Sequence, residues 1–462
     1  MPTLDDDEGL VFPAPQRSRM SPARPLRFCH ITTFYPPENF GGDGIFVERL
    51  VRELASRGHH IEVIHDADAF GLLHRGPVPA APPSPPGVVV HTLRSRFGSL
   101  SPLLTQQFGV PGLKGPRIRA ILDAGRFDVV HYHNISLVGG PGILSLGPRS
   151  AVKLYTTHEH WLVCPMHVLW RYDREVCPGK ECLRCQLHGG RPPQLWRGTG
   201  LLARSLRDVD AFIAPSRDSL ARHLAELDLP FAHIPHFLAP ERSAERAPER
   251  APATGRPAVA DRIAAVEAPT PERPYFLFVG RLEKIKGLQD VIAAFRRYDG
   301  ADLLVAGDGE YGETLRALAA DIPRVRFLGR LPYEALRALY RGAIAAIVPS
   351  VCLEAFGMVV IEAFAEGAPA IVRRLGALPE VVDESGGGFV YATEEELIRA
   401  METLRADPSL RRALGEKGRA AYRARWTPEA HLAQYFTLIG DLAEKKGAAE
   451  VAQAARASAE ER

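Results

Sequence analysis

Residues 349–364 read PSVCLEAFGMVVIEAF, and they are the most informative stretch of the chain. An apolar run precedes them and another follows Gly357, so the pattern predicts a strand, a turn and a helix, the repeating unit of an α/β fold. The first turn of a helix has unpartnered N–H groups and the positive end of the helix dipole, so the amides near Phe356 and Gly357 are candidate phosphate ligands. Glu362, inside the helix, is a candidate ligand for the hydroxyls of a sugar beside that phosphate, and Glu354, on the preceding loop, for those of a second sugar.

A second stretch, FLFVGRLEKIKG at residues 276–287, places two cations after an apolar strand. The strand ends at Gly280, and Arg281 and Lys286 follow it. Arginine offers a planar fork to phosphate oxygens and lysine a mobile point charge, so the two together suit a diphosphate. Either cation alone is typical of an ordinary surface, but together with the two glutamates the pattern favours a binding site.

Apolar runs alternate with helical patterns such as that of residues 45–57. The runs that we interpret as strands lie at residues 26–32, 60–65, 128–133, 152–157 and 211–215 and, in a second series, at 276–279, 303–306, 325–329, 345–348 and 369–372. This alternation predicts parallel sheets with crossover helices, and therefore an α/β fold.

Length and composition set broad limits on this protein. With 462 residues, of which 46% are hydrophobic and 24% charged, the chain can form two cores. The net charge of +2 argues against a dedicated nucleic-acid binder. No apolar run approaches the roughly 18 residues of a membrane span, and the acids from Asp5 to Glu8 are atypical of a signal peptide. We expect a cytoplasmic protein, translated from Met1 or Met20.

Basic and apolar residues are interleaved between positions 94 and 119. The cations of this segment are Arg94, Arg96, Lys114, Arg117 and Arg119. Such a segment can touch anionic lipid at the inner membrane face. A solvated surface is the alternative.

Three spaced motifs resemble those of the retaining glycosyltransferases of family 4, which have the GT-B architecture. They are the Glu-x7-Glu element (Glu354, Glu362), the Gly-Arg-x4-Lys-Gly element (residues 280–287) and the run EGAPA at 366–370 followed by GALPE at 376–380. The resemblance covers roughly residues 26 to 440. It implies two Rossmann-like domains that face each other across a cleft.

The resemblance also implies a reaction, namely sugar transfer with retention from a nucleotide diphosphate sugar, a UDP- or GDP-sugar, without a divalent metal at the diphosphate. Arg281, Lys286 and the amides near Gly357 would stabilise the leaving diphosphate. Glu354 would hold sugar hydroxyls and Glu362 the ribose. The acceptor would be a hydroxyl of a polysaccharide, glycolipid or small molecule, and neither a protein partner nor nucleic acid is expected. A nucleotide-sugar epimerase, a phosphorylase and an inactive binding protein remain as alternatives.

The expected division of the chain follows from these observations. It comprises a disordered leader at 1–25, an N-terminal acceptor domain at 26–238 with a Cys-rich insert at 164–188, a linker at 239–273, a C-terminal donor domain at 274–425, a helix at 426–445 that crosses back to the first domain, and a tail at 446–462 that is disordered or a frayed helix.

Polar and glycine residues also follow strands of the first series. Gly41 and Gly42 precede a helix, where glycines allow close approach to a ligand, although a plain tight turn also fits. The resemblance implies that they face the donor diphosphate and that His158 contacts the transferred sugar. His133 is expected further from it or on the acceptor side.

The sequence GDGEYG at residues 307–312 has the spacing of a dinucleotide fingerprint. That fingerprint needs an acid about 20 residues on, at the end of the next strand. Gly329 and Arg330 stand there instead, so we interpret the glycines as a strand-to-helix turn and expect no nicotinamide cofactor.

Four of the six cysteines, Cys164, Cys177, Cys182 and Cys185, lie within 22 residues. In a cytosolic protein this density indicates a structural zinc site held by thiolates. The spacing is irregular for a zinc ribbon, so scattered thiols or a redox-labile pair are equally compatible.

Overall fold

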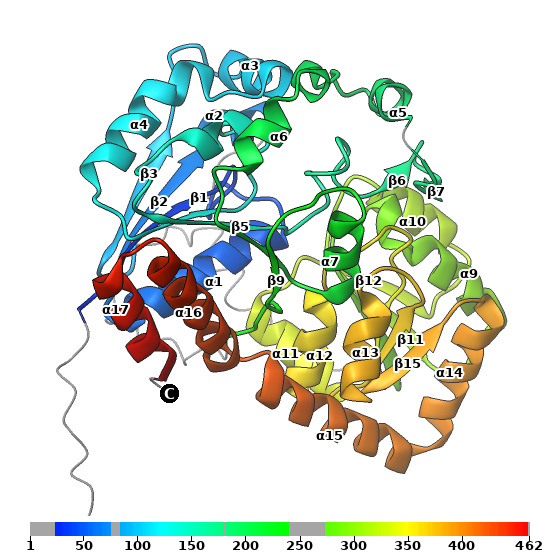
Figure 1. The fold of residues 1–462 in the computed structure, drawn as a ribbon. Helices are drawn as coiled ribbons and strands as arrows, with labels where there is room; N and C mark the ends of the chain where they lie inside the picture. Colours follow the sequence, from blue (N-terminus) through cyan, green and yellow to red (C-terminus); the bar gives the residue numbers. More distant parts are fainter. Residues whose placement is uncertain (1–23, 75–83, 180, 240–272, 461–462) are drawn as a thin grey trace, which may run out of the picture.

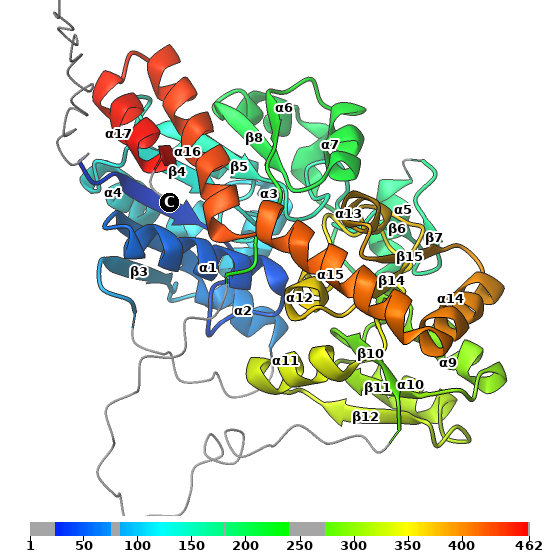
Figure 2. The same cartoon turned by 90° about the horizontal axis from the view of Figure 1, so that it is seen from below.

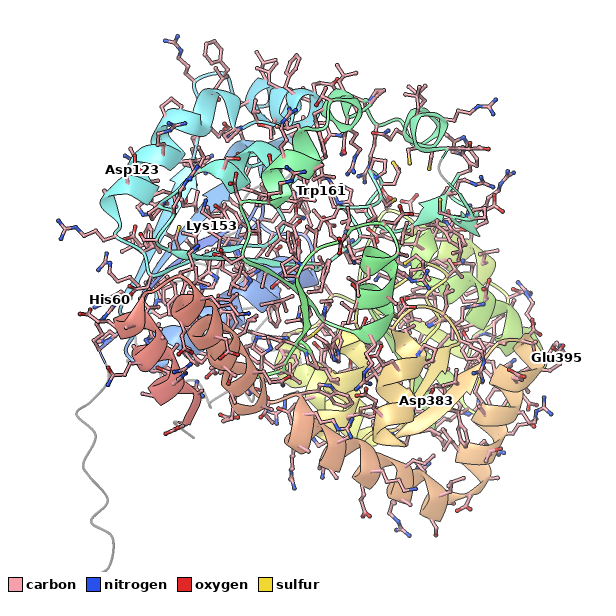
Figure 3. All side chains as sticks on the ribbon, in the orientation of Figure 1. His60, Asp123, Lys153, Trp161, Asp383 and Glu395 are labelled. Carbon is pink, nitrogen blue, oxygen red and sulfur yellow. The ribbon has the colours of Figure 1, made fainter. Side chains whose placement is uncertain are left out.

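The computed structural model describes residues 24–74, 84–179, 181–239 and 273–460. Nearly all of the expected leader and of the expected linker lies outside these residues. Figure 1 shows two halves, each with a parallel sheet between helices. Figure 3 shows side chains filling both halves, with Trp161, which is 1% exposed, inside the first.

The first half contains a seven-stranded sheet in which all neighbouring strands are parallel. Its strands, in spatial order, are β3 (Val88–Leu93), β2 (His60–Asp66), β1 (Arg27–Ile31), β4 (Val129–Tyr132), β5 (Val152–Thr156), β8 (Ala211–Ala214) and β9 (Phe231–His233). A two-stranded hairpin, β6 (Trp170–Arg171) and β7 (Glu175–Val176), stands apart from this sheet.

The second half contains a six-stranded parallel sheet. Its strands, in spatial order, are β12 (Val325–Gly329), β11 (Asp302–Ala306), β10 (Tyr275–Val279), β13 (Ala346–Val348), β14 (Ala370–Arg373) and β15 (Gly388–Tyr391). Numbered within this half, the order is 3-2-1-4-5-6, the Rossmann order, and the first half begins in the same way. The order reverses between β1 and β4 and between β10 and β13, and open α/β sheets bind ligands beside such switch points.

Helices cover both sheets (Figure 1). The helices of the first half are α1 (Gly42–Ser56), α2 (Ala67–Leu73), α3 (Leu100–Phe108), α4 (Gly115–Ala124), α5 (Cys182–His188), α6 (Leu201–Leu206) and α7 (Arg217–Leu224), with 3₁₀ turns η1 (Gly112–Lys114), η2 (Pro141–Ser145) and η3 (Leu195–Gly198). Those of the second half are α9 (Leu288–Arg297), α10 (Gly312–Leu318), α11 (Tyr333–Gly342), α12 (Met358–Glu366), α13 (Leu378–Ser385), α14 (Glu394–Ala406) and α15 (Pro408–Arg425), with the 3₁₀ turn η4 (Lys284–Lys286). Within the described residues, no helix is both long and apolar enough to span a membrane.

The chain ends on the first half, although α15 lies on the second (Figure 2). Helix α16 (Pro428–Lys445) begins after Thr427, whose side chain accepts a hydrogen bond from the Ala430 amide as an N-cap. Tyr435, Phe436 and Ile439 then pack in one core with residues of β1, β2 and α1. Burial of these apolar side chains fastens the end of the chain to the first half.

Of the two alternatives expected for the tail, disorder is wrong for the described residues 446–460, most of which are helical. Residues Ala449–Glu460 form helix α17, which packs against α16. Val451, Ala452 and Ala455 are buried in the core of the first half. Their i, i+1, i+4 spacing makes a narrow apolar stripe, and alanine is the best helix former. The composition of this segment, rich in Ala, Glu and Arg, does not indicate the stripe, which is visible only in the spacing of its apolar residues.

Candidate functional site

The predicted site residues follow strands that flank the two switch points. In the second half, Arg281 follows β10 and Glu354 follows β13. In the first half, Gly41 precedes α1 in the connection that follows β1, and His133 follows β4. The carboxyl ends of parallel strands meet at one edge of a sheet, so residues far apart in sequence gather there.

An ion pair joins Lys286 and Glu354, with 2.7 Å between Nζ and Oε1. The hydroxyl of Ser350 donates a second hydrogen bond to the same oxygen at 2.6 Å. Burial raises the pKa of Glu354, but the attraction of Lys286 and the two hydrogen bonds outweigh it, so its pKa lies below the usual value. Burial alone would lower the pKa of Lys286. The attraction of Glu354 outweighs burial, so the pKa of Lys286 lies above its usual value. Both groups are therefore charged at neutral pH.

Arg281 lies close enough to act on both members of this pair. Its charge lowers the pKa of Glu354 and opposes protonation of Lys286. Its side chain is 51% exposed and pairs with Glu283 at 2.8 Å. The structure thus gathers two cations and one carboxylate, and leaves Arg281 open to an arriving anion.

Close backbone contact presses the loops of this cluster together. Gly287 has a φ of 71°, and a Cβ there would lie 2.0 Å from the carbonyl oxygen of Pro349. Only glycine fits such an approach. The loop that carries Lys286 is therefore held against the loop that carries Glu354.

Helix α12 begins at this cluster. Gly357 is its N-cap and supplies no side-chain hydrogen bond, so the first amides keep the capacity to hold an anion. Gly280, at the end of β10, has a φ of 157°. The ring of Phe356, beside the helix start, packs edge-on against His236 of the first half, with 5.5 Å between centroids.

Glu362 faces different partners. It accepts a hydrogen bond from the Tyr340 hydroxyl at 3.3 Å and lies 3.9 Å from Arg49 of α1. Burial raises its pKa, and Arg49 and Tyr340 only partly oppose this. The contact with Arg49 bridges the two halves, so ribose binding by Glu362, which stays a prediction, would have to compete with that pair.

The first turn of α1 contains a sterically required glycine, Gly44, which is not one of the predicted pair. A Cβ on Gly44 would meet the Asn39 side chain at 2.3 Å and the Phe34 carbonyl oxygen at 2.9 Å. A Cβ on Gly42 would meet nothing within 4 Å, and one on Gly41 only the Asp43 carboxylate at 3.4 Å. The fold itself therefore does not demand the predicted pair, and the space beside them is open to a ligand.

Four histidines form one hydrogen-bonded chain. His133 bonds to His30 at 3.0 Å and to His158 at 2.9 Å, and His158 bonds to His236 at 3.1 Å. Burial lowers the pKa of each, to about 3 for His30 and about 4 for His158. All four are therefore neutral at pH 7. A neutral imidazole has one N–H, so each link needs one donor and one acceptor, and the four tautomers are set together.

Both ring nitrogens of His158 are thus occupied by other histidines. A contact with a sugar, as predicted, requires His158 to release one of them. His160, two residues further on, is the residue of this loop that interacts with Glu354: burial lowers its pKa to about 3, and the Leu353 backbone and the Glu354 carboxylate oppose that shift.

Sequence reasoning missed several residues where the halves meet. The Ser216 hydroxyl donates to the carbonyl of Ala355 at 2.7 Å, and the Arg217 and Asp218 amides donate to Glu380. Glu380 lies in the GALPE motif, and Ser216 follows the end of strand β8. Both positions are typical of site residues and could have been predicted. The contact of Ser216 with Ala355, 139 positions away in the sequence, gave no local signal.

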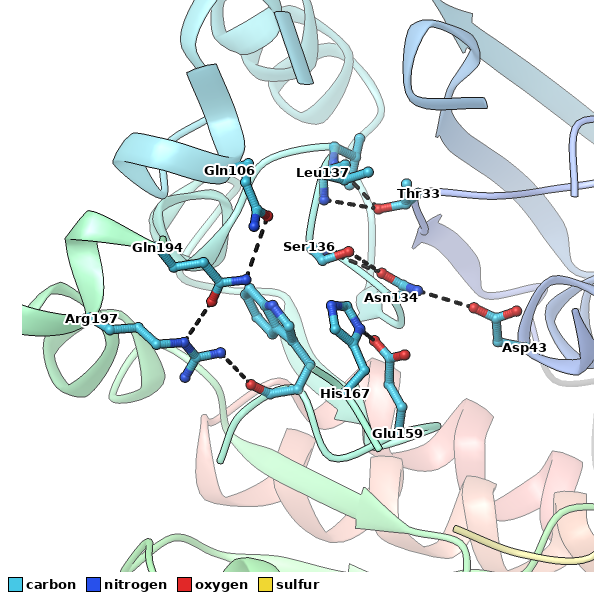
Figure 4. A network of polar contacts seen from close by, with 12 residues as sticks. Thr33, Asp43, Gln106, Asn134, Ser136, Leu137, Glu159, His167, Gln194 and Arg197 are labelled. Carbon is cyan, nitrogen blue, oxygen red and sulfur yellow. Dashed lines mark hydrogen bonds and ion pairs between the residues drawn. The ribbon is translucent and has the colours of Figure 1, made fainter. Parts of the chain in front are cut away.

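Loops around the histidines are braced by polar contacts (Figure 4). Asn134 donates to the Asp43 carboxylate at 3.1 Å, which links the end of β4 to the glycine loop. Glu159 bonds to His167 at 2.7 Å, and Arg197 donates to the Trp161 carbonyl at 2.5 Å. The network ties the His158 loop to the Cys-rich insert that follows it.

The GDGEYG stretch lies on the turn between β11 and α10. A Cβ on Gly307 would lie 1.9 Å from the Gly280 carbonyl oxygen. Close packing of two strand ends therefore accounts for this glycine without any ligand.

Known proteins match both halves of the chain. The family described as "Glycosyltransferase Family 4" matches residues 40–242, and "Glycosyl transferases group 1" matches residues 260–421. The GDP-mannose-dependent monoacylated alpha-(1-6)-phosphatidylinositol monomannoside mannosyltransferase of Corynebacterium glutamicum is 37% identical over 158 residues, which is 32% of this chain and 41% of that protein. The lipopolysaccharide core biosynthesis glycosyltransferase LpsE of Rhizobium meliloti is 30% identical over 191 residues, 40% of this chain and 55% of that protein. The chain thus spans about half or less of these relatives.

Solved structures resemble the whole described fold. Sucrose-phosphate synthase from Thermosynechococcus elongatus superposes with a TM-score of 0.65 at 21% identity, over 91% of this chain and 100% of that one. HepE from Anabaena, solved with UDP and glucose, superposes with a TM-score of 0.54 at 17% identity, over 92% of this chain and 98% of that one. At such identities the likeness concerns the fold, two Rossmann-like domains in the GT-B arrangement.

Proposed function

Since this chain belongs to the family 4 glycosyltransferases, we propose that it transfers a sugar from a nucleotide diphosphate sugar to a hydroxyl acceptor, with retention of the anomeric configuration. The ion pair of Lys286 and Glu354, beside the open N-terminus of α12, carries this proposal. The family resemblance supports retention. The names of similar proteins, one GDP-mannose-dependent and one solved with UDP, support a UDP- or GDP-sugar as donor.

The proposed chemistry follows from where charge develops. Breaking the anomeric bond leaves negative charge on the diphosphate and positive charge on the sugar ring. Lys286, Arg281 and the first amides of α12 stabilise the leaving diphosphate, and they are positioned before the reaction. Glu354 holds Lys286 charged and offers its second carboxylate oxygen to sugar hydroxyls. Arg281, whose side chain is exposed, exchanges its partner Glu283 for phosphate oxygens.

The test is an assay of the purified full chain with UDP- and GDP-sugars and a panel of hydroxyl acceptors. We expect a glycosylated product whose anomeric configuration, measured by NMR, equals that of the donor. An epimerised donor without acceptor dependence would identify an epimerase, and cleavage that consumes inorganic phosphate a phosphorylase. Saturable donor binding without turnover in any condition would leave only a binding protein.

We further propose that the acceptor is presented at a membrane surface. An outer face of the first half exposes the large apolar side chains Phe97, Leu100, Leu103, Phe108, Val110 and Leu113. They lie on and around α3, at the top of Figure 1. The exposed residues Arg117 and Arg119 follow on α4, and Arg96 lies 4.8 Å above the Phe97 ring. Apolar side chains ringed by cations suit an anionic lipid surface.

One cation expected at this face is not available to lipid. Lys114 is 4% exposed and pairs with Asp66 and Asp68, at 3.0 Å from the latter. The buried charges of Lys114, Asp66 and Asp68 thus pair with one another. The position of Lys114 in the sequence does not indicate this pairing.

Replacing Phe97 and Leu100 by serine should weaken binding to vesicles of phosphatidylcholine and phosphatidylglycerol about tenfold or more, because each large apolar side chain adds roughly 1.5–3 kcal/mol when fully buried. Co-sedimentation measures the effect. Leu318→Ser, on the second half and 39% exposed, is the matched control and should bind as the unaltered protein does. Equal binding of all three proteins would refute the membrane face.

A further inference from the structure

Four thiols line one small cavity beside the first half. Cys164, Cys177, Cys182 and Cys185 surround about 20 Å³, together with Met166 and Trp170. Cys182 and Cys185 lie three positions apart in the first turn of α5 and so share one side of it. The other two come from the loop after β5 and from the end of the β6–β7 hairpin. Hairpin, loop and helix thus converge on one point.

The size of the cavity restricts what it holds. About 20 Å³ accommodates one water-sized sphere and excludes an organic ligand. Four sulfur ligands around a single ion are the preferred environment of structural zinc. Backbone hydrogen bonds from Met166 and Leu169 reach the sulfur of Cys164, an arrangement that orients a metal-binding thiolate. Arg197 interacts with Cys164 and Cys182 and offsets part of the −2 charge of such a centre.

Residues 164–188, the Cys module, cannot hold themselves together by apolar burial. The two strands are two residues long, and Leu183 and Leu187 on α5 are 58% and 60% exposed. Four non-glycine residues, His167, Leu169, Tyr172 and Asp173, have positive φ angles, which cost free energy. Segments this short need a crosslink or a metal to fold.

A competing metal site exists among the described residues. His30, His131 and His133 each place a ring nitrogen within 4.8 Å of the others, and the thiols do not form such a tight group. The histidines are held in place, however: His133 bonds to His30 and His158, and His131 bonds to Tyr435 and Thr156. All three are buried in the core. The four thiols line one existing cavity, and Cys177 donates a hydrogen bond only to the carbonyl of its neighbour Gly179, at 2.9 Å.

We propose that Cys164, Cys177, Cys182 and Cys185 bind one zinc ion that fixes the Cys module to the loop of His158 and His160. Backbone bonds already join the two: the Cys164 amide donates to the His160 carbonyl at 2.7 Å, and the His160 amide donates to the His167 carbonyl at 2.9 Å. The outer contact of the module, Asp173 with Lys284 at 3.3 Å, is exposed and adds little. The ion therefore supplies the rigidity that the module lacks.

The test measures metal content, which is independent of sugar transfer. Full-length protein, expressed with zinc in the medium, should contain about one zinc per chain by mass spectrometry. Cobalt exchanged for zinc should show the sulfur-to-metal charge-transfer absorption of thiolate ligands. Cys182→Ser with Cys185→Ser should lose at least nine tenths of the metal, whereas Cys29→Ala and His30→Asn should retain it.

Several outcomes would overturn the proposal. Absence of zinc from the purified protein would overturn it, whether thiol titration shows the four cysteines to be free or joined in disulfides. Metal lost in His30→Asn and kept in the cysteine variant would assign it to the histidines. If the cysteine variant does not fold, the cobalt spectrum of the unaltered protein decides alone, because imidazole ligands give no thiolate charge transfer.

Discussion

Replacing Lys286 by alanine is expected to lower kcat/KM for sugar transfer by a factor of about 10²–10³, the usual effect of removing one preorganised group that stabilises developing charge. Lys286 is a quarter exposed and is held 2.7 Å from Glu354, so it meets the diphosphate without reorganisation. The alanine variant loses that charge and also leaves Glu354 without its counterion, which raises the pKa of Glu354. Steady-state kinetics with the donor identified in the assay measures the loss.

Lys284→Ala is the matched control for this experiment. Lys284 lies on the same 3₁₀ turn, is 44% exposed and pairs only weakly with Asp173. It should change kcat/KM less than threefold. Melting temperatures of both variants exclude unfolding as the cause. Similar activities of the Lys286 and Lys284 variants would place the diphosphate elsewhere.

Acidification from pH 7.5 to 5.5 is expected to unfold or loosen the first half while the second half stays folded. All sixteen histidines lie outside residues 237–430, so the second half, from Arg273 to Trp426, contains none. Burial lowers the pKa of His59, His65 and His431 to about 4, as it does for His158.

The direction of the effect follows from the depressed pKa values. These imidazoles are neutral in the folded protein, whereas in the unfolded chain they bind protons below about pH 6.5. Their contribution to stability is complete above that pH and is lost as the pH falls toward 4. Each contributes a loss of about 1 kcal/mol between pH 6.5 and 5.5. Several such losses approach the total stability of a typical domain.

Hydrogen exchange with mass spectrometry, corrected for intrinsic exchange rates, measures the loss of stability separately for each segment of the chain. Peptides that cover β1, β4 and β5 should lose protection at pH 5.5, and peptides that cover β10 and β11 serve as the internal control. Equal protection of both halves at pH 5.5, or equal loss, would contradict the prediction.

Much of the donor half was predictable from local pattern. Cations and carboxylates that follow apolar strands at fixed spacing predict Arg281, Lys286 and Glu354 as site residues, and the structure brings these three together. The parallel order of the strands places them at one sheet edge. The same pattern predicts Glu362, yet its side chain faces Arg49 and Tyr340, because a residue's position in a helix does not tell which neighbour lies opposite it.

Other features depended on contacts between distant segments. Nothing in the local sequence indicates that His158 is held by His133 and His236, because those partners lie 25 and 78 positions away. The same is true of Lys114, which pairs with Asp66 in the interior instead of facing lipid. Composition alone also does not predict that α17 is folded, because its alanines are buried only by packing against α16.

The α/β class, the two-domain division as a hypothesis and the family itself could be read from the sequence, because strand and helix periodicity and motif spacing are local properties of the chain. Only the tertiary structure decided which groups are charged, which are buried and which face each other where the halves meet. Desolvation and hydrogen bonding depend on every element packed around a side chain. For this reason the histidine chain and the cavity shared by four thiols became visible only once the chain was folded.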